Sequence, residues 1–221
     1  TLSIIDTLKE KAEDHEKEIP VTFYVEKSRI NSATGRTILK DHMAANGHEI
    51  AIHGVMPNDE DHHKKHQDTP ELQDELTDMK NLISAAEAGG QTAESVRPPG
   101  GWGGWQQGTQ RSKQQVADIY EAVSLKRYTG EGTDGTNSWG AVYPSSANTP
   151  PTGAQRTAFM DSITDVIDEA VAETATKILV VLLHDVRTPD KDDIGNIVDE
   201  LENYADGHAA VIEYVRMKDL S

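Results

Sequence analysis

Three short segments of the chain each run through apolar residues and end on a side chain that can do chemistry. They are residues 47–54, ending on His53 and Gly54; residues 95–100, where Arg97 precedes two prolines; and residues 180–185, ending on His184 and Asp185. Histidine can bind a metal or move a proton near neutral pH, and arginine can hold a carboxylate. In α/β barrels such side chains enter the active site at the carboxyl ends of the strands. We therefore expect these endings to contribute to one site.

The elements that must position these side chains alternate along the chain. Apolar residues at helical spacing predict helices at 2–12, 33–46, 69–88, 112–122, 161–174 and 192–205, the second of them stopping at Gly47. Runs of β-branched and aromatic residues predict strands at 21–25, 48–53, 94–97, 122–125, 177–183 and 209–214. Residues 98–112 and 128–156 lack periodicity and predict long loops. The alternation implies βαβ units, and so an α/β fold with a mainly parallel sheet in a single domain over residues 1–221.

Composition limits the partners of this chain. It has 38 acidic and 21 basic residues, and its net charge of −17 would be repelled by nucleic acid and by anionic membranes. It has no cysteine, so a metal site must use nitrogen and oxygen ligands. No run of about 18 apolar residues is present, so we expect no membrane span. We therefore expect no polyanionic partner.

Taken in order, the segments resemble the polysaccharide deacetylase family, the carbohydrate esterases related to the nodulation-factor deacetylase. The segments that carry the resemblance are Val21-Thr22-Phe23-Tyr24-Val25, Gly47-His48-Glu49-Ile50-Ala51-Ile52-His53, Arg97-Pro98-Pro99-Gly100, Trp139 and Leu182-Leu183-His184-Asp185. The resemblance implies a distorted, incomplete (β/α) barrel and metal-dependent removal of acetyl groups, mostly from N-acetylated sugars. It also favours an extracellular or cell-envelope location.

The resemblance implies a role for each matching residue. His53 matches the first histidine of a divalent metal site, most commonly zinc, and His184 matches the general acid that protonates the departing amine. Arg97 matches the arginine that holds the catalytic carboxylate, and the backbone N–H near Gly100 would bind the oxyanion. His48 lies an odd number of residues from His53, so it points to the opposite face of the strand, and we expect it to be structural.

The resemblance also implies a glycan groove. Trp102, Trp105 and Trp139 lie in predicted loops, where indoles suit stacking on sugar rings and a structural role is the alternative. Asp134 precedes Trp139 as in the family motif that lines the groove, although Asp134-Gly135 also has the composition of a turn. Leu182, two residues before His184, is assigned to the same groove.

Two departures from the family pattern concern the metal. The family has a second histidine four residues after the first, and that position is Pro57 here. His62 and His63 lie in the polar segment that follows and are the candidates to replace it, ahead of His66; a solvated loop is the alternative for all three. The family's first strand also ends in an aspartate pair that serves as base and metal ligand. No such pair precedes Leu2, so we expect the chain to begin after that strand, with the pair either upstream of Thr1 or lost.

Two hypotheses follow. The first is a metal-dependent hydrolase that removes acetyl groups from an N-acetylated or O-acetylated glycan, with zinc on His53, a loop histidine and a carboxylate from outside these 221 residues. The second is a catalytically silent homologue that binds glycan without cleaving it. Metal content and acetate release distinguish the two.

Overall fold

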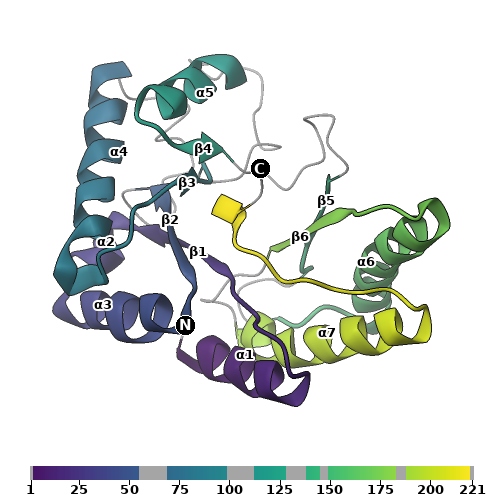
Figure 1. Cartoon of the computed structure of the whole chain (residues 1–221). Coiled ribbons are helices and arrows are strands. Elements are labelled where there is room, and N and C mark those ends of the chain that lie inside the picture. Colours follow the sequence, from purple (N-terminus) through teal and green to yellow (C-terminus); the bar gives the residue numbers. More distant parts are fainter. Residues whose placement is uncertain are drawn as a thin grey trace. The chain divides into compact units, whose positions relative to one another are not determined.

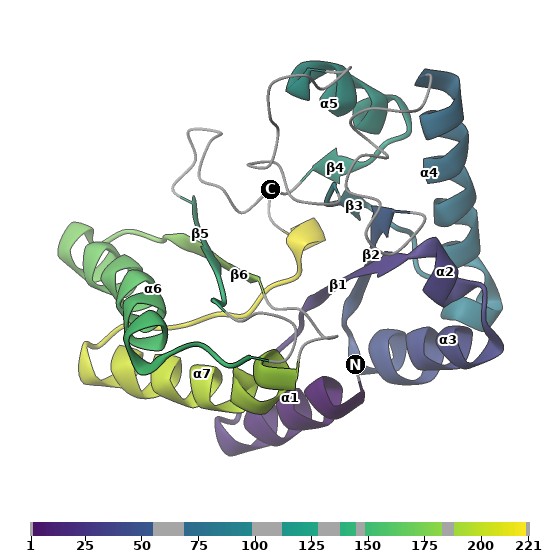
Figure 2. The same ribbon diagram turned by 180° about the vertical axis from the view of Figure 1, so that it is seen from behind.

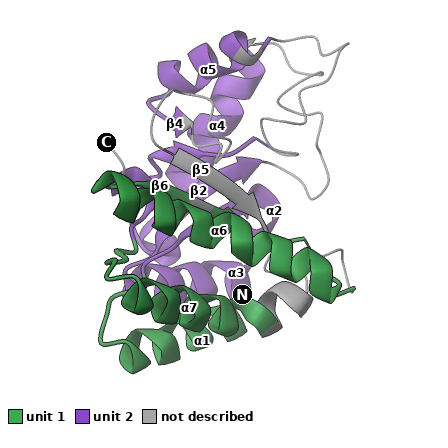
Figure 3. Ribbon diagram, turned by 90° about the vertical axis from the view of Figure 1, so that its right-hand side faces the viewer, with its two compact units in different colours: residues 1–19, 130–214 green, residues 20–129, 215–221 purple. Residues whose placement is uncertain are grey.

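The computed structural model of this chain describes residues 2–54, 69–98, 112–127, 138–144, 149–182 and 188–219 (Figure 1). The chain divides into two compact units (Figure 3). Unit 1 comprises residues 1–19 and 130–214, and unit 2 comprises residues 20–129 and 215–221. Neither unit is continuous in sequence, so each depends on pairing segments that are far apart along the chain.

Unit 2 contains a parallel sheet whose strands follow the order of the chain. The strands are β1 (Thr22–Glu26), β2 (Glu49–Gly54), β3 (Ser95–Val96) and β4 (Lys126–Arg127). Thr22 lies opposite Glu49, and the register between β1 and β2 is regular until an irregularity after Val25. Because all three neighbouring pairs are parallel, the residues that follow β2 and β3 emerge at the same edge of the sheet.

Helices cover one side of this sheet, as the two opposite views show (Figures 1 and 2). They are α2 (Lys27–Ile30), α3 (Ala33–Thr37), the π-helix η1 (Ile38–Met43), η2 (Ala44–Asn46), α4 (Thr69–Ser84), η4 (Ala86–Ala88) and α5 (Lys113–Ala122). The short helix η5 (Met217–Asp219) lies instead at the start of β1 and β2, where the Met217 N–H donates to Thr22 and the Lys218 N–H donates to Glu49. The apolar stripe of α4 is fully buried at Leu72, Leu76, Met79 and Ile83, the spacing of one helical face. Gly47 has φ of 77°, which favours glycine, and it ends the helical segment as the sequence predicts.

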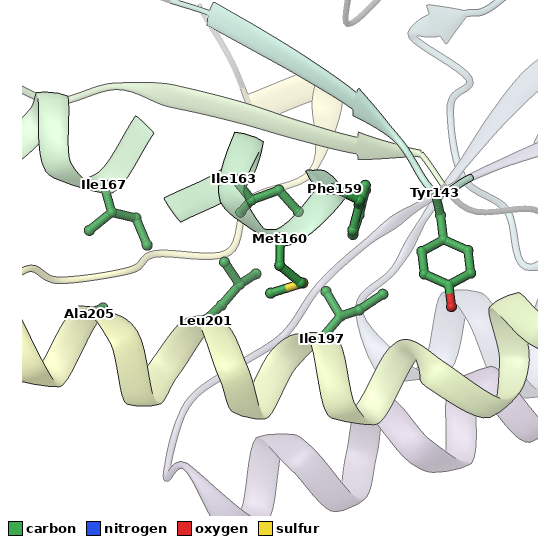
Figure 4. Close-up of a cluster of buried hydrophobic side chains, with 8 residues drawn as sticks. All are labelled: Tyr143, Phe159, Met160, Ile163, Ile167, Ile197, Leu201 and Ala205. Atoms are coloured by element: carbon green, nitrogen blue, oxygen red, sulfur yellow. The ribbon is translucent and has the colours of Figure 1, made fainter. Parts of the chain in front are cut away.

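The described residues of unit 1 form three helices and one pair of strands. They are α1 (Leu2–Asp14), β5 (Ser138–Val142), α6 (Gly153–Glu173), β6 (Ile178–Leu182) and α7 (Thr188–Gly207). β5 and β6 pair in parallel, α6 packs against β5 and α7, and α1 packs against α7. Figure 4 shows the core between α6 and α7. It consists of Tyr143, Phe159, Met160, Ile163, Ile167, Ile197, Leu201 and Ala205.

Ile163 is fully buried in this core, so its truncation gives a direct measure of packing in unit 1. We expect Ile163→Ala to lower the free energy of unfolding by about 2–5 kcal/mol, because the lost transfer energy adds to the cost of a cavity. Urea denaturation followed by circular dichroism measures the change. Val171→Ala is the matched control on the same helix, since Val171 is 44% exposed, and it should change stability by no more than about 0.5 kcal/mol. Equal effects of the two substitutions would contradict this core.

The structure confirms an α/β fold built on parallel strands, and the described strands form two open sheets. Three local predictions are wrong. The predicted loop 128–156 contains β5, whose short Gly-containing sequence becomes a strand by pairing with β6. The strand expected at 122–125 is displaced to β4, because the helix α5 and its turn occupy those residues. The strand expected at 209–214 belongs to neither sheet. These residues carry the β-branched pattern but pair with no strand among the described residues, and Val211 is 90% exposed.

No helix within the described ranges is both long enough and apolar enough to cross a bilayer.

Candidate active site

The centre of the site described in unit 2 lies where β2 and β3 end side by side. Ile52 pairs with Val96 in the parallel ladder, and the backbone N–H of Arg97 donates to the Ile52 carbonyl at 3.0 Å. His53 follows Ile52 within β2, and Arg97 directly follows the last residue of β3. The register of the sheet therefore brings together two residues that are 44 positions apart and that the sequence predicts for one site.

The hydrogen bond between these two residues fixes the chemical form of the imidazole. His53 Nδ1 lies 2.9 Å from the main-chain carbonyl oxygen of Arg97. A carbonyl oxygen only accepts, so Nδ1 carries the hydrogen and donates it. In the neutral ring the lone pair then belongs to Nε2. This is the arrangement of metal-binding histidines, which usually donate one ring N–H to a carbonyl or carboxylate and bind the metal with the other nitrogen.

The surroundings also keep His53 neutral. The side chain is partly buried, and this burial lowers the pKa of His53 from its ordinary value of 6.5. The hydrogen bond to the Arg97 carbonyl acts in the opposite direction, and the positive charge of Arg97 adds a further lowering. Metal binding requires a deprotonated nitrogen, so the lowered pKa favours binding at neutral pH.

This shift predicts a pH dependence of stability in metal-free protein. The folded state disfavours the imidazolium, so the unfolded chain binds the proton more readily. The stabilisation is therefore complete above the ordinary pKa of 6.5 and is lost as the pH falls through 6.5 toward the lower folded-state pKa. In His53→Asn the amide still donates to Arg97 but cannot be protonated. Between about pH 8 and about pH 5, wild type should lose more unfolding free energy than this variant; equal losses would contradict the shift.

His48, the other histidine of this segment, has a structural environment. Its side chain is 3% exposed, its Nδ1 accepts a hydrogen bond from the Val21 N–H at 3.3 Å, and its ring meets Phe23 edge to face at 5.4 Å. These contacts tie the start of β2 to the start of β1. They agree with the structural role expected from strand alternation.

The sequence analysis missed a buried carboxylate on the same strand. Glu49 is fully buried, and its Oε1 accepts from the Ser95 hydroxyl at 2.7 Å. Its Oε2 accepts from the Thr22 hydroxyl at 2.7 Å and from the Lys218 N–H at 3.0 Å. Glu49 therefore joins β1, β2 and β3 to the C-terminal segment, at the opposite end of β2 from His53. One signal in the sequence could have revealed it: an acidic residue directly precedes the apolar run Ile50-Ala51-Ile52. A charged side chain is rarely buried without partners, so a carboxylate at this place predicts a buried hydrogen-bond network.

The remaining predicted site residues are placed only in part. Trp139 lies on β5 opposite Leu179, not in a loop as predicted, and Leu182 is the last residue of β6, opposite Val142. The structure gives the backbone of these two residues. The others lie outside the described residues: Gly100, Trp102, Trp105, Asp134, His62, His63 and His184.

Of the predicted metal ligands, His53 alone falls within the described ranges, and within them no group of three His, Asp or Glu side chains is arranged to hold a metal. The tautomer and the lowered pKa of His53 nevertheless fit a metal ligand, so His53 is compatible with zinc binding through Nε2.

Parallel strands with helical connections and polar side chains at their carboxyl ends place the chain among the α/β proteins built from successive strand–helix units. The sequence pattern of the polysaccharide deacetylases matches residues 3–118, more than half of the chain. The chain therefore belongs to the polysaccharide deacetylase family. No curated protein matches it closely enough to count as a relative.

Solved structures of this family share the fold. A CE4 esterase from Streptococcus mutans has a TM-score of 0.59 at 18% identity, over 97% of this chain and 77% of that one. A polysaccharide deacetylase from Bacillus cereus has a TM-score of 0.57 at 17% identity, over 98% and 87%. A mutant of a CE4 family pseudoenzyme with restored enzymatic activity has a TM-score of 0.55 at 13% identity, over 98% of this chain; the chain spans 62% of that protein's length. At these identities the likeness establishes the fold alone, and it confirms the predicted fold class.

Proposed function

We propose that this protein is a zinc-dependent deacetylase that hydrolyses the acetyl group of an N-acetylated or O-acetylated glycan. Membership of the polysaccharide deacetylase family supports the reaction class. The observation that carries the metal dependence is the hydrogen bond from His53 Nδ1 to the Arg97 carbonyl, because it leaves Nε2 as the lone-pair nitrogen of a neutral imidazole.

In this proposal His53 is one of the zinc ligands, and His63 or His62 supplies the nitrogen that Pro57 cannot. A zinc ion held in this way would acidify a bound water and polarise a carbonyl. The chain's own task at this position is to keep the His53 ring neutral and in the correct tautomer. Partial burial and the positive charge of Arg97 favour the neutral ring, and the hydrogen bond to the Arg97 carbonyl fixes the tautomer.

The other residues act on the acetyl group and on the leaving group. The Arg97 guanidinium holds the carboxylate that takes the proton from water, and the backbone N–H near Gly100 stabilises the oxyanion. His184 protonates the departing amine or alcohol. Trp102, Trp105 and Trp139, with Asp134 and Leu182, line the groove for the sugar. These roles are carried over from the family resemblance and form part of the proposal.

A second candidate function is glycan binding without cleavage. It is favoured by a specific feature of the sequence, the proline at position 57 where the family has its second metal histidine. A protein without that ligand would keep the groove and lose the affinity for zinc.

One experiment separates the two candidates. The purified protein is stripped of metal, titrated with zinc in a calorimeter, and then incubated with N-acetylated chitooligosaccharide and with acetylated xylan while released acetate is measured. Zinc binding together with zinc-dependent acetate release supports the deacetylase. Glycan binding with neither zinc uptake nor acetate release refutes it and supports the silent homologue.

A further inference from the structure

The main chain of Arg97 bonds to β2 in two ways. Its N–H donates to the Ile52 carbonyl at 3.0 Å, and its C=O accepts from His53 Nδ1 at 2.9 Å. In an extended strand the N–H and the C=O of one residue point to the same side. Both bonds to β2 therefore require Arg97 to stay extended, although the ladder between β2 and β3 ends at Val96.

The residue that keeps Arg97 extended is its neighbour, Pro98. A proline ring disfavours the α-helical conformation of the preceding residue and biases it toward extended backbone. Pro98 is buried, which further limits how this part of the chain can move. Backbone N–H groups alternate in direction along a strand, so the N–H that a proline lacks at position 98 would have faced β4 and not β2. Pro98 thus leaves the β2 side intact while it prevents the ladder with β4 from continuing past Val96.

We propose that Pro98 is a positioning residue for His53: by holding Arg97 extended, it aims the Arg97 carbonyl at Nδ1 and so selects the tautomer whose Nε2 can bind a metal. The use of that tautomer for zinc rests on the proposed function, whereas the selection of the tautomer does not. Pro98 itself touches neither substrate nor metal in this role. It acts through the backbone of Arg97.

The test measures the tautomer directly. Proton–nitrogen correlation NMR spectra of metal-free protein with isotope-labelled histidine distinguish protonated from unprotonated ring nitrogens, and His53→Asn identifies the His53 signals by their loss. We expect wild-type His53 to be protonated at Nδ1 alone when neutral. In Pro98→Val, which fills the buried space without restricting residue 97, we expect a mixture of tautomers and zinc binding weaker by about 10–100-fold, the usual cost of losing an outer-shell partner.

Pro70→Ala is the matched control, because Pro70 is an exposed proline at the start of α4. It should leave both the tautomer and the zinc affinity unchanged. Circular dichroism verifies the fold of each variant, and Pro98→Ala replaces Pro98→Val if the valine variant does not fold. A single Nδ1–H tautomer in the folded Pro98 variant would overturn the proposal, as would a mixture in wild type. If wild type shows the single Nδ1–H tautomer and the Pro98 variant shows a mixture, but wild type binds no zinc, the positioning role of Pro98 stands and the proposed function is refuted.

Discussion

Replacement of His53 with alanine is expected to abolish tight zinc binding and to reduce acetate release to the level of the buffer blank. A zinc site of a hydrolase usually has three protein ligands and one open position, so the loss of one ligand leaves too few to hold the ion. The loss of affinity should exceed the roughly 10–100-fold expected when only an outer-shell partner is removed. Calorimetric titration with zinc and an acetate assay measure the two effects on the same preparation.

Two further histidine variants make this result specific. In His48→Asn the side-chain amide oxygen replaces Nδ1 as the acceptor of the hydrogen bond from the Val21 N–H. Because His48 is not a proposed metal ligand, this variant should retain zinc binding. His184→Ala should also retain zinc, while its rate falls about 10²–10⁴-fold because the general acid is missing. Loss of zinc from all three variants would indicate a general effect on folding and would contradict the roles assigned here. Full zinc affinity in His53→Ala would remove His53 from the metal site.

Replacement of Glu49 with alanine is expected to produce a large loss of stability in unit 2. The carboxylate accepts hydrogen bonds from Ser95, Thr22 and Lys218, and alanine would leave all three donors without this acceptor, the Ser95 hydroxyl in a buried place and the other two partly buried. A stranded donor costs roughly 1–3 kcal/mol, and the two partly buried donors belong at the low end of that range, so the free energy of unfolding should fall by about 3–5 kcal/mol. Urea denaturation measures the change, and hydrogen exchange at the Lys218 amide reports whether the C-terminal segment detaches.

Two glutamate variants serve as controls for this loss. Glu49→Gln keeps the size and one oxygen acceptor, and it should cost less than alanine because part of the hydrogen bonding survives. Glu87→Ala removes an exposed carboxylate from the same unit and should change stability by less than about 0.5 kcal/mol. A loss below about 1 kcal/mol in Glu49→Ala would show that water satisfies these donors and that the buried network contributes little.

Local sequence patterns determined most of the helices and the first two strands. The helix 2–12, the strand 21–25 and the stop at Gly47 depend on interactions between near neighbours, such as an apolar stripe or a backbone angle that glycine adopts easily. The ordered strand endings at His53 and Arg97 likewise identified the family, and the match over residues 3–118 confirmed it. These features are encoded within a few residues of where they occur.

Long-range pairing decided the rest. β5 is a strand because β6 lies beside it. The segment 209–214 has a sequence that favours a strand more strongly than that of β5, but it pairs with neither of the described sheets and is not a strand. The partner of His53 is a main-chain carbonyl 44 residues away, and the partners of Glu49 come from three other segments. Main-chain acceptors leave no trace in residue type, since every residue has one. The sequence by itself therefore identified His53 as a candidate ligand and identified the protein family. The register of β2 with β3 decided which ring nitrogen of His53 can bind a metal.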